Sequence, residues 1–165
     1  EAVSEFASRA AEKLRRQHSL AGEIMVFIRT SPFRKDPQYS RSVVIPLLRP
    51  SADTGVLVQA AVTGLQSIYR SGYKYAKAGV MLLDLQPDTV SQGELDLGEG
   101  DTMDEATEKA GLMSALDTIN MRFGKGTMKM ASAGLAGDRR VWSMKQERRT
   151  PAYTTRWEDM PVARA

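Results

Sequence analysis

Basic side chains gather in the first half of the sequence, next to segments of strand-like composition. The basic residues are Arg29, Arg34, Lys35, Arg41, Lys74 and Lys77, and the interleaved hydroxyl residues are Thr30, Ser31, Ser40 and Ser42. Lysine and arginine bind phosphates by releasing counterions, and hydroxyls fix the register of a nucleic acid without reading its bases. The pattern predicts a phosphate-backbone site, and it is equally compatible with a solvated rim.

The sequence has few of the side chains that acid–base catalysis or metal binding requires. His18 is the only histidine and the chain has no cysteine, so a transition-metal site is not expected. Asp84 and Asp88 do not form a cluster that would hold two magnesium ions. The GKG at Gly124 to Gly126 lacks the spacing of a phosphate-binding loop, and a helix end explains it better. We therefore expect this chain to bind rather than to catalyse.

The acidic stretch VSQGELDLGEGD, Val90 to Asp101, places Leu95 and Leu97 among glycines and acids. A flexible peptide of this kind can extend and insert its leucines into an apolar groove on a partner. The alternative is an ordinary linker whose leucines fold back on the nearest helix.

The tail of the chain mixes cations with aromatic rings. The residues are Arg139, Arg140, Lys145, Arg148, Arg149 and Arg156, with Trp142, Tyr153 and Trp157. Such a mixture suits single-stranded nucleic acid or an acidic protein surface. It also suits an arm that packs its rings onto its own domain.

Hydrophobic periodicity predicts the elements that position these residues, in the order helix, strand, strand, helix, strand. The opening helix should carry Val3, Phe6, Ala7, Ala10 and Leu14 on one face, and a turn at HSLAG should follow it. Strands are expected at Glu23 to Thr30, Arg41 to Arg49 and Tyr75 to Leu85. The second helix should be capped by Ser51 or Asp53 and ended by Gly72. Pro46 favours an edge strand or a bulge. The order predicts an α+β fold, a small sheet with two helices on one face and the other face free.

Composition divides the chain into three parts. We expect a first domain over residues 1–87, an acidic linker over 88–102, and a small helical or irregular C-terminal domain over 103–165. In the last part, Asp101 or Thr102 should cap a helix with Leu112, Leu116 and Ile119 on one side. This part is too small for its own core and should dock on something.

Charge follows the same division. Residues 1–90 carry 12 Lys/Arg and 8 acids, residues 91–121 carry 1 and 8, and residues 122–165 carry 10 and 4, within a net charge of +3. The absence of cysteine and of any long apolar run indicates a soluble, cytoplasmic protein without a membrane partner. The chain opens inside an amphipathic pattern without Met, so we expect a piece of a longer protein.

Four blocks of sequence resemble a known family. RTSPF (Arg29 to Phe33), YKYAKAGVML (Tyr73 to Leu82), ALDTINMRFGKGT (Ala115 to Thr127) and SMKQERRTPAYTTRWEDM (Ser143 to Met160) are similar to the C-terminal part of the UmuC family. That family includes the catalytic subunit of bacterial DNA polymerase V and belongs to the Y-family translesion polymerases. The likeness runs through nearly the whole chain.

The resemblance implies a little-finger domain, a clamp-binding peptide and a small C-terminal domain. A little finger is a four-stranded sheet backed by two helices, so its first strand would precede Glu1. The family's catalytic carboxylates lie in the palm, together with its magnesium and dNTPs, so this fragment would need no cofactor and would not itself be an enzyme. Its function would be sequence-independent binding of template–primer duplex and docking to the sliding clamp in error-prone SOS DNA repair, associated with the bacterial nucleoid.

Little fingers grip phosphates at places that match Lys74, Lys77, Arg41 and Ser42, and less firmly Arg29 and Thr30. Arg34 and Lys35 belong to the same predicted DNA-binding set. The clamp-binding residues would be Gln92, Leu95 and Leu97 in QGELDL, a weakened form of the usual peptide. The alternative function is a protein-interaction module that docks on UmuD-type subunits or the recombinase filament and binds little DNA.

Overall fold

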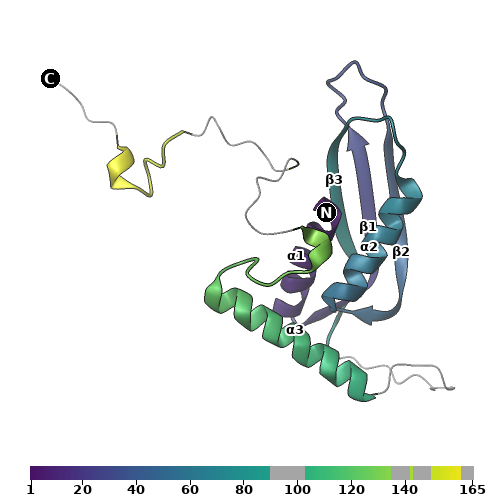
Figure 1. Ribbon diagram of the computed structural model, residues 1–165, viewed down its shortest axis with the longest axis vertical. Helices are drawn as coiled ribbons and strands as arrows, with labels where there is room; N and C mark the ends of the chain where they lie inside the picture. Colours follow the sequence, from purple (N-terminus) through teal and green to yellow (C-terminus); the bar gives the residue numbers. More distant parts are fainter. Residues whose placement is uncertain (90–102, 135–141, 143–149, 161–165) are drawn as a thin grey trace.

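The chain folds into a three-stranded antiparallel sheet with helices on one face, and a further helix packs beside them (Figure 1). The computed structural model describes residues 1–89, 103–134, 142 and 150–160, and the side chains of α3 from residue 108 onward. This architecture confirms the predicted α+β class.

The sheet has the order β2-β1-β3, so β1 (Ser19–Thr30) is central and β2 (Ser40–Ser51) and β3 (Tyr75–Pro87) are its edges. β1 pairs with both neighbours in antiparallel register. Pro46 lies in β2 opposite Glu23, where the register shifts. The prediction that Pro46 marks an edge strand or a bulge is confirmed, because a residue without an N–H is tolerated there.

α1 (Ala2–Arg16) and α2 (Thr54–Ile68) cover the face of the sheet on which Ile24, Val26 and Ile28 are buried. Alternate residues of a strand point to opposite faces, so this half of β1 builds the core. Each fully buried aliphatic side chain contributes about 1.5–3 kcal/mol to folding. Asp53 caps α2, since its Oδ1 accepts the Val56 N–H at 2.9 Å, one of the two caps that the sequence predicts.

The turn between α1 and β1 is shorter than predicted. HSLAG was expected to be a turn, but β1 already begins at Ser19 and Leu20 pairs with Gln86 of β3. His18 adopts a left-handed φ of 51°, so one residue reverses the chain and leaves the rest free to join the ladder. α2 also ends earlier than Gly72, at Ile68.

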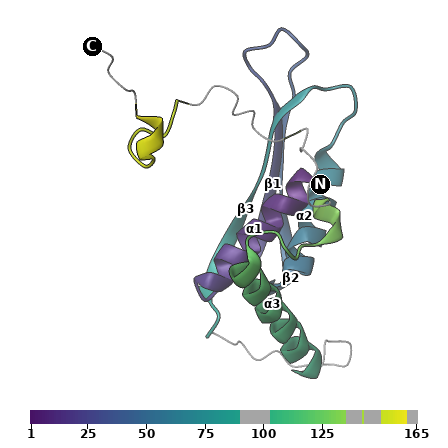
Figure 2. The same cartoon turned by 60° about the vertical axis from the view of Figure 1, so that its left-hand side comes forward.

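The C-terminal region begins with α3 (Met103–Phe123) and continues into two single-turn 3-10 helices, η1 (Ala131–Ala133) and η2 (Trp157–Asp159). α3 and η1 pack against the helix layer (Figures 1 and 2). Met113 of α3 is buried there, whereas Leu112 is 58% exposed. The predicted contact face of this helix was therefore wrong at Leu112, since Met113 Sδ accepts the Thr54 N–H at 3.5 Å and sets the rotation of the helix. Across the part of the chain that the structure describes, no helix has the length and apolarity to cross a membrane.

Candidate nucleic-acid interface

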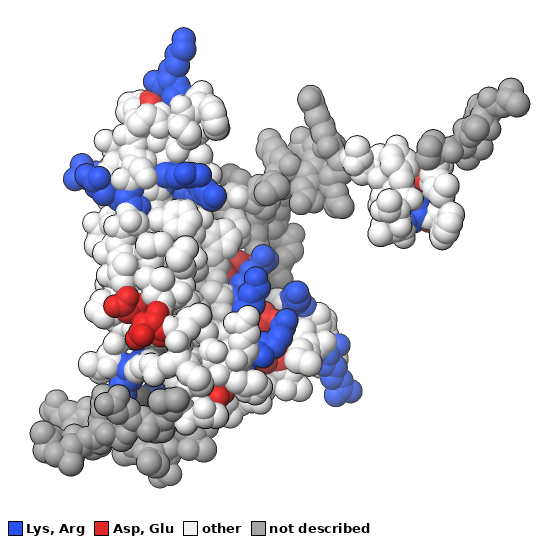
Figure 3. Space-filling model, turned by 180° about the vertical axis from the view of Figure 1, so that it is seen from behind, with Lys and Arg blue, Asp and Glu red and all other residues white. Residues whose placement is uncertain are grey.

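The face of the sheet opposite α1 and α2 is not covered by any described helix (Figures 2 and 3). The buried positions of β1 alternate with positions that point to this open face, which include Met25, Phe27 and Arg29. The sequence prediction of a free sheet face is confirmed for the described residues.

One end of the open face is a shallow basic hollow. Its lining residues are Met25, Phe27, Arg29, Ser40, Arg41, Ser42 and Lys77. Arg29 lies directly opposite Lys77 on β3 and Ser40 on β2, and Ser42 lies opposite Phe27. The sheet thus brings two cations and two hydroxyls from three strands onto one surface.

Arg29 and Lys77 are like charges at directly opposed positions of neighbouring strands. Side chains at such positions have Cβ atoms about 4.5–5.5 Å apart, and a like-charged pair there is destabilising. Neither residue forms an ion pair with a described carboxylate. An anion bound over the hollow would relieve this repulsion.

Phe27 lines the hollow, and its ring lies close to Gly79 of β3. A Cβ on Gly79 would come within 2.5 Å of this ring, so the glycine is required for the close approach. Phe27 pairs with Ser42 on β2 and with Gly79 on β3, and it adds an apolar group to the lining of the hollow.

Two of the predicted DNA-binding residues point elsewhere. Thr30 is buried, and its hydroxyl donates to Gln38 Oε1 at 2.6 Å and accepts the Tyr39 N–H at 3.0 Å, so it fixes the loop between β1 and β2. Arg41 pairs with the buried Ile28, so strand alternation directs its side chain to the helix side, where its guanidinium stands 5.9 Å from the Tyr39 ring centroid. Arg41 nevertheless borders the hollow, because it is an exposed residue of an edge strand.

The remaining predicted cations lie at the tip of the sheet. Arg34 and Lys35 are exposed in the loop between β1 and β2. Lys74 is placed in the loop before β3, and its Nζ lies 3.4 Å from Oδ1 of Asp36. This exposed ion pair joins the two loops and partly neutralises Lys74.

Charge on the open face is graded along the strands. Figure 3 shows most of the basic side chains of this face at and near the tip, with a patch of acidic side chains further down and a further basic side chain below that patch. On β1, Arg29 lies near the tip end and Glu23 lies six residues earlier on the same side of the strand. A polyanion would therefore be attracted to the tip half of the face.

The clamp-binding residues of the sequence prediction, Gln92, Leu95 and Leu97, lie outside the described residues. Among the residues that are described, no group of three or more His, Cys, Asp or Glu side chains could hold a metal ion. The interface is thus built from cations, hydroxyls and apolar side chains.

The first 95 residues, which contain the whole sheet and its hollow, match the impB/mucB/samB family C-terminal domain. The chain belongs to the impB/mucB/samB family. Residues 110–163 of this family member match a second module, a domain of unknown function designated DUF4113. The resemblance to UmuC-type proteins that the four sequence blocks predict is confirmed.

Several relatives of this impB/mucB/samB protein align with almost its entire length. It is 41% identical to protein UmuC of Salmonella typhimurium over 97% of the chain, and 44% identical to protein SamB of Salmonella typhimurium over 99%. It is 40% identical to protein MucB of Escherichia coli over 99% of the chain. The aligned region makes up 36–37% of these relatives, so the chain spans about a third of their length.

Sequence reasoning missed two parts of the hollow in this family member. Phe27 and Gly79 were assigned only to the strands expected at Glu23 to Thr30 and at Tyr75 to Leu85. The available signal was the alternation along Ile24 to Arg29, which places Phe27 on the same side as Arg29. The contact between Phe27 and Gly79 depends on register, which sequence alone does not give.

Proposed function

We propose that this domain grips the template–primer duplex of DNA through its phosphates, as a non-catalytic part of an error-prone translesion polymerase acting in SOS DNA repair. The observation that carries the proposal is the opposed pair of Arg29 and Lys77 on an open sheet face without a described acidic partner. Holding two such cations together is unfavourable unless an anion is bound.

The chemistry of the hollow favours a phosphate backbone over base edges. Ser40 and Ser42 supply short hydroxyls beside Arg29, which suits contacts to phosphate oxygens. Arg34 and Lys35 would extend the path at the tip, with Lys74 and Arg41 at its margins. Binding that ignores sequence suits an enzyme that must accept any damaged template. We leave Thr30 out of the contact set because its hydroxyl is buried.

The salt dependence of DNA binding tests this function. Binding of primer–template DNA should fall linearly on a plot of log affinity against log salt, and Lys77→Glu should weaken all DNA sequences alike and reduce the slope by about 1. The measurement is fluorescence anisotropy with labelled duplexes at several salt concentrations. Arg122→Glu, with the same charge change at an exposed position of α3, is the matched control and should bind nearly as the unmodified chain does. A flat salt dependence would refute the proposal.

Catalysis by the longer protein would take place outside this chain. We propose that the family's carboxylates, magnesium and dNTPs meet in a palm domain that precedes it, and that the protein works at the bacterial nucleoid. The chain's own contribution would be to hold the duplex beside that site.

A second proposed role is docking to the sliding clamp through Gln92, Leu95 and Leu97. One short peptide raises the local concentration of the domain near DNA without any further contact. The double change Leu95→Ala, Leu97→Ala should abolish capture of the chain by immobilised clamp, with DNA binding unchanged. Undiminished capture would show that these leucines do not bind the clamp and that the stretch is an ordinary linker.

The alternative function, a module that docks on UmuD-type subunits or the recombinase filament, is favoured by a different observation. Large apolar side chains of the C-terminal region remain exposed, including Met121 at 79%, Phe123 at 66% and Trp157 at 87%. Exposed apolar groups of this size are characteristic of protein interfaces. Removing residues 110–165 separates the two functions, because DNA binding through the sheet should survive the deletion and partner binding should not.

A further inference from the structure

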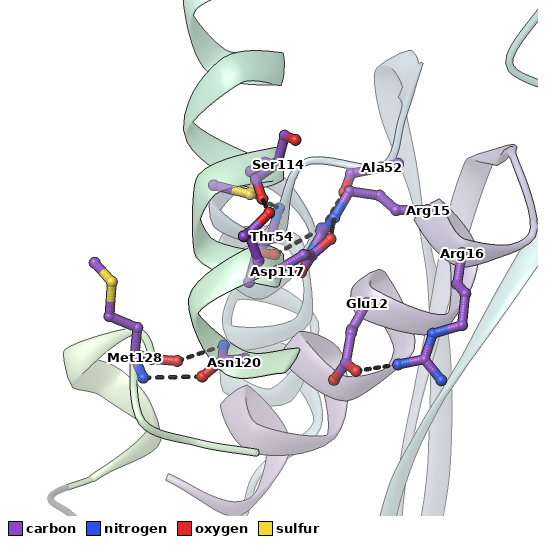
Figure 4. Close-up of polar contacts among 11 residues, drawn as sticks. Glu12, Arg15, Arg16, Ala52, Thr54, Ser114, Asp117, Asn120 and Met128 are labelled. Atoms are coloured by element: carbon purple, nitrogen blue, oxygen red, sulfur yellow. Dashed lines mark hydrogen bonds and ion pairs between the residues drawn. The ribbon is translucent and has the colours of Figure 1, made fainter. Parts of the chain in front are cut away.

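A crevice lies on the helix side of the molecule, between α1, α3 and the segment 125–133. Its volume is about 380 Å³, within the range of small-ligand sites. α1 and α2 cover the sheet on the side away from its open face (Figures 1 and 2), and no described residue lines both the crevice and the basic hollow. The crevice is therefore separate from the proposed DNA interface. Figure 4 shows the polar contacts that hold its walls together.

Two side chains fix the walls. Arg15 of α1 donates from Nε and Nη2 to the two carboxylate oxygens of Asp117 on α3, each at 2.7 Å, and from Nη1 to the Ala52 carbonyl and to Thr54 (Figure 4). Asn120 binds the backbone of Met128 in both directions at 2.9 Å, which pins the segment after α3. Hydrogen bonds therefore hold two walls of the crevice in place, α3 against α1 and the segment after α3 against α3.

The described lining of the crevice contains six cations and three carboxylates. Every carboxylate is paired with an arginine of α1, in the pairs Glu5–Arg9, Glu12–Arg16 and Asp117–Arg15. The three lysines, Lys13, Lys125 and Lys129, have no ion-pair partner among the described residues. The crevice therefore carries three positive charges that no described carboxylate neutralises.

Lys129 is the residue of the crevice that most strongly indicates a bound ligand. Its Nζ is buried and, within the described structure, has no hydrogen-bond partner. Burying an ammonium group without a partner costs free energy, because the group loses its hydrogen bonds to water and forms none with the protein. A ligand that accepts hydrogen bonds and carries negative charge would satisfy it.

We propose that this crevice binds a phosphate group, with Lys129 as its principal ligand and Lys13 and Lys125 as supporting cations. Carboxylates are matched best by the planar fork of arginine, and all three arginines of the crevice already bind carboxylates of the chain itself. The free donors are ammonium groups, which bind phosphate as point charges. The phosphate would come from a free nucleotide or from a nucleic-acid strand.

Calorimetric titration of the whole 165-residue chain tests the site at constant ionic strength. The probes are inorganic phosphate, a 5′-phosphorylated mononucleotide and a short single-stranded oligonucleotide. Phosphate should bind the unmodified chain, and Lys129→Gln should weaken it by about tenfold or more, since a charge-assisted hydrogen bond is lost. Lys129→Arg, which keeps the charge, should retain most of the affinity. Tighter binding of the mononucleotide than of the oligonucleotide would identify a free nucleotide as the source, and the reverse order a strand.

Two controls make the outcome decisive. Arg122→Gln removes one positive charge at an exposed position of α3 that lines neither the crevice nor the hollow, and it should change phosphate affinity by less than about twofold. Lys77→Glu should weaken duplex binding, and Lys129→Gln should still weaken phosphate binding when it is made in the Lys77→Glu background, so the two proposals can fail separately. The site would be overturned by any of three results: no binding of any phosphate probe by the unmodified chain, equal weakening by Lys129→Gln and Arg122→Gln, or binding of hexaglutamate in place of phosphate.

Discussion

At the scale of single residues, the contact between Phe27 and Gly79 decides the shape of the proposed interface. Gly79 has no side chain, so the Phe27 ring can approach the backbone of β3 closely and line the hollow together with Arg29 and Lys77. A larger residue at position 79 would displace the ring. The open face therefore depends on an absence of side-chain atoms as much as on charge.

Gly79→Ala should destabilise the fold by about 1–3 kcal/mol, because its Cβ would meet two Phe27 ring carbons at 2.5 and 2.6 Å. The measurement is the free energy of unfolding from urea denaturation. Gly111→Ala on α3 is the matched control, since a Cβ there meets no atom within 4 Å and alanine favours a helix by up to about 1 kcal/mol. Equal effects of the two changes would show that the ring does not occupy this position.

At the scale of elements, Arg15 joins the C-terminal region to the first domain. It reaches from α1 to α3 and to the start of α2, and its side chain is only 15% exposed. Arg16, the next residue, forms an exposed pair with Glu12 one turn back on its own helix. Arg15 therefore connects three helices, whereas Arg16 forms an ion pair only within α1.

Arg15→Met should lower the free energy of unfolding by about 2–3 kcal/mol, because it leaves Asp117 and the Ala52 carbonyl without a charged donor. Arg16→Met should cost less than about 1 kcal/mol, as an exposed ion pair contributes little. Urea denaturation gives both values, and limited proteolysis should show α3 released only in the Arg15 variant. Similar losses in both variants would contradict the role given to Arg15.

At the scale of the whole molecule, the helix layer separates two basic sites. One is the open sheet face near the tip, and the other is the crevice between α1 and α3. Both buried core clusters consist of residues from α1, α2 and the sheet. The first domain therefore keeps its core members when the C-terminal region is removed.

Deleting residues 110–165 should leave duplex DNA binding within about threefold of the unmodified chain, because the proposed contacts lie on the sheet and contribute additively. The same deletion should remove any binding to UmuD-type subunits or recombinase filaments. Anisotropy with DNA and co-precipitation with the proteins give the two readouts, and circular dichroism checks that the shortened chain is folded. Loss of DNA binding by a folded deletion variant would favour the interaction-module alternative.

Sequence by itself determined the local features of this protein. Periodicity and caps identified three strands and their helices, and Pro46 indicated an edge strand, because these signals depend on residues close together in the chain. The four blocks that resemble the UmuC family determined the family for the same reason, since they are strings of consecutive residues.

Only the tertiary structure decided which distant residues meet. It placed Arg29 opposite Lys77, turned Thr30 into the core, directed Arg41 toward Tyr39 and joined Arg15 to Asp117. These outcomes depend on strand register and helix rotation, where a shift of one residue moves a side chain to the opposite face. Such shifts are settled by packing across the whole molecule, which neighbouring residues in the sequence do not specify.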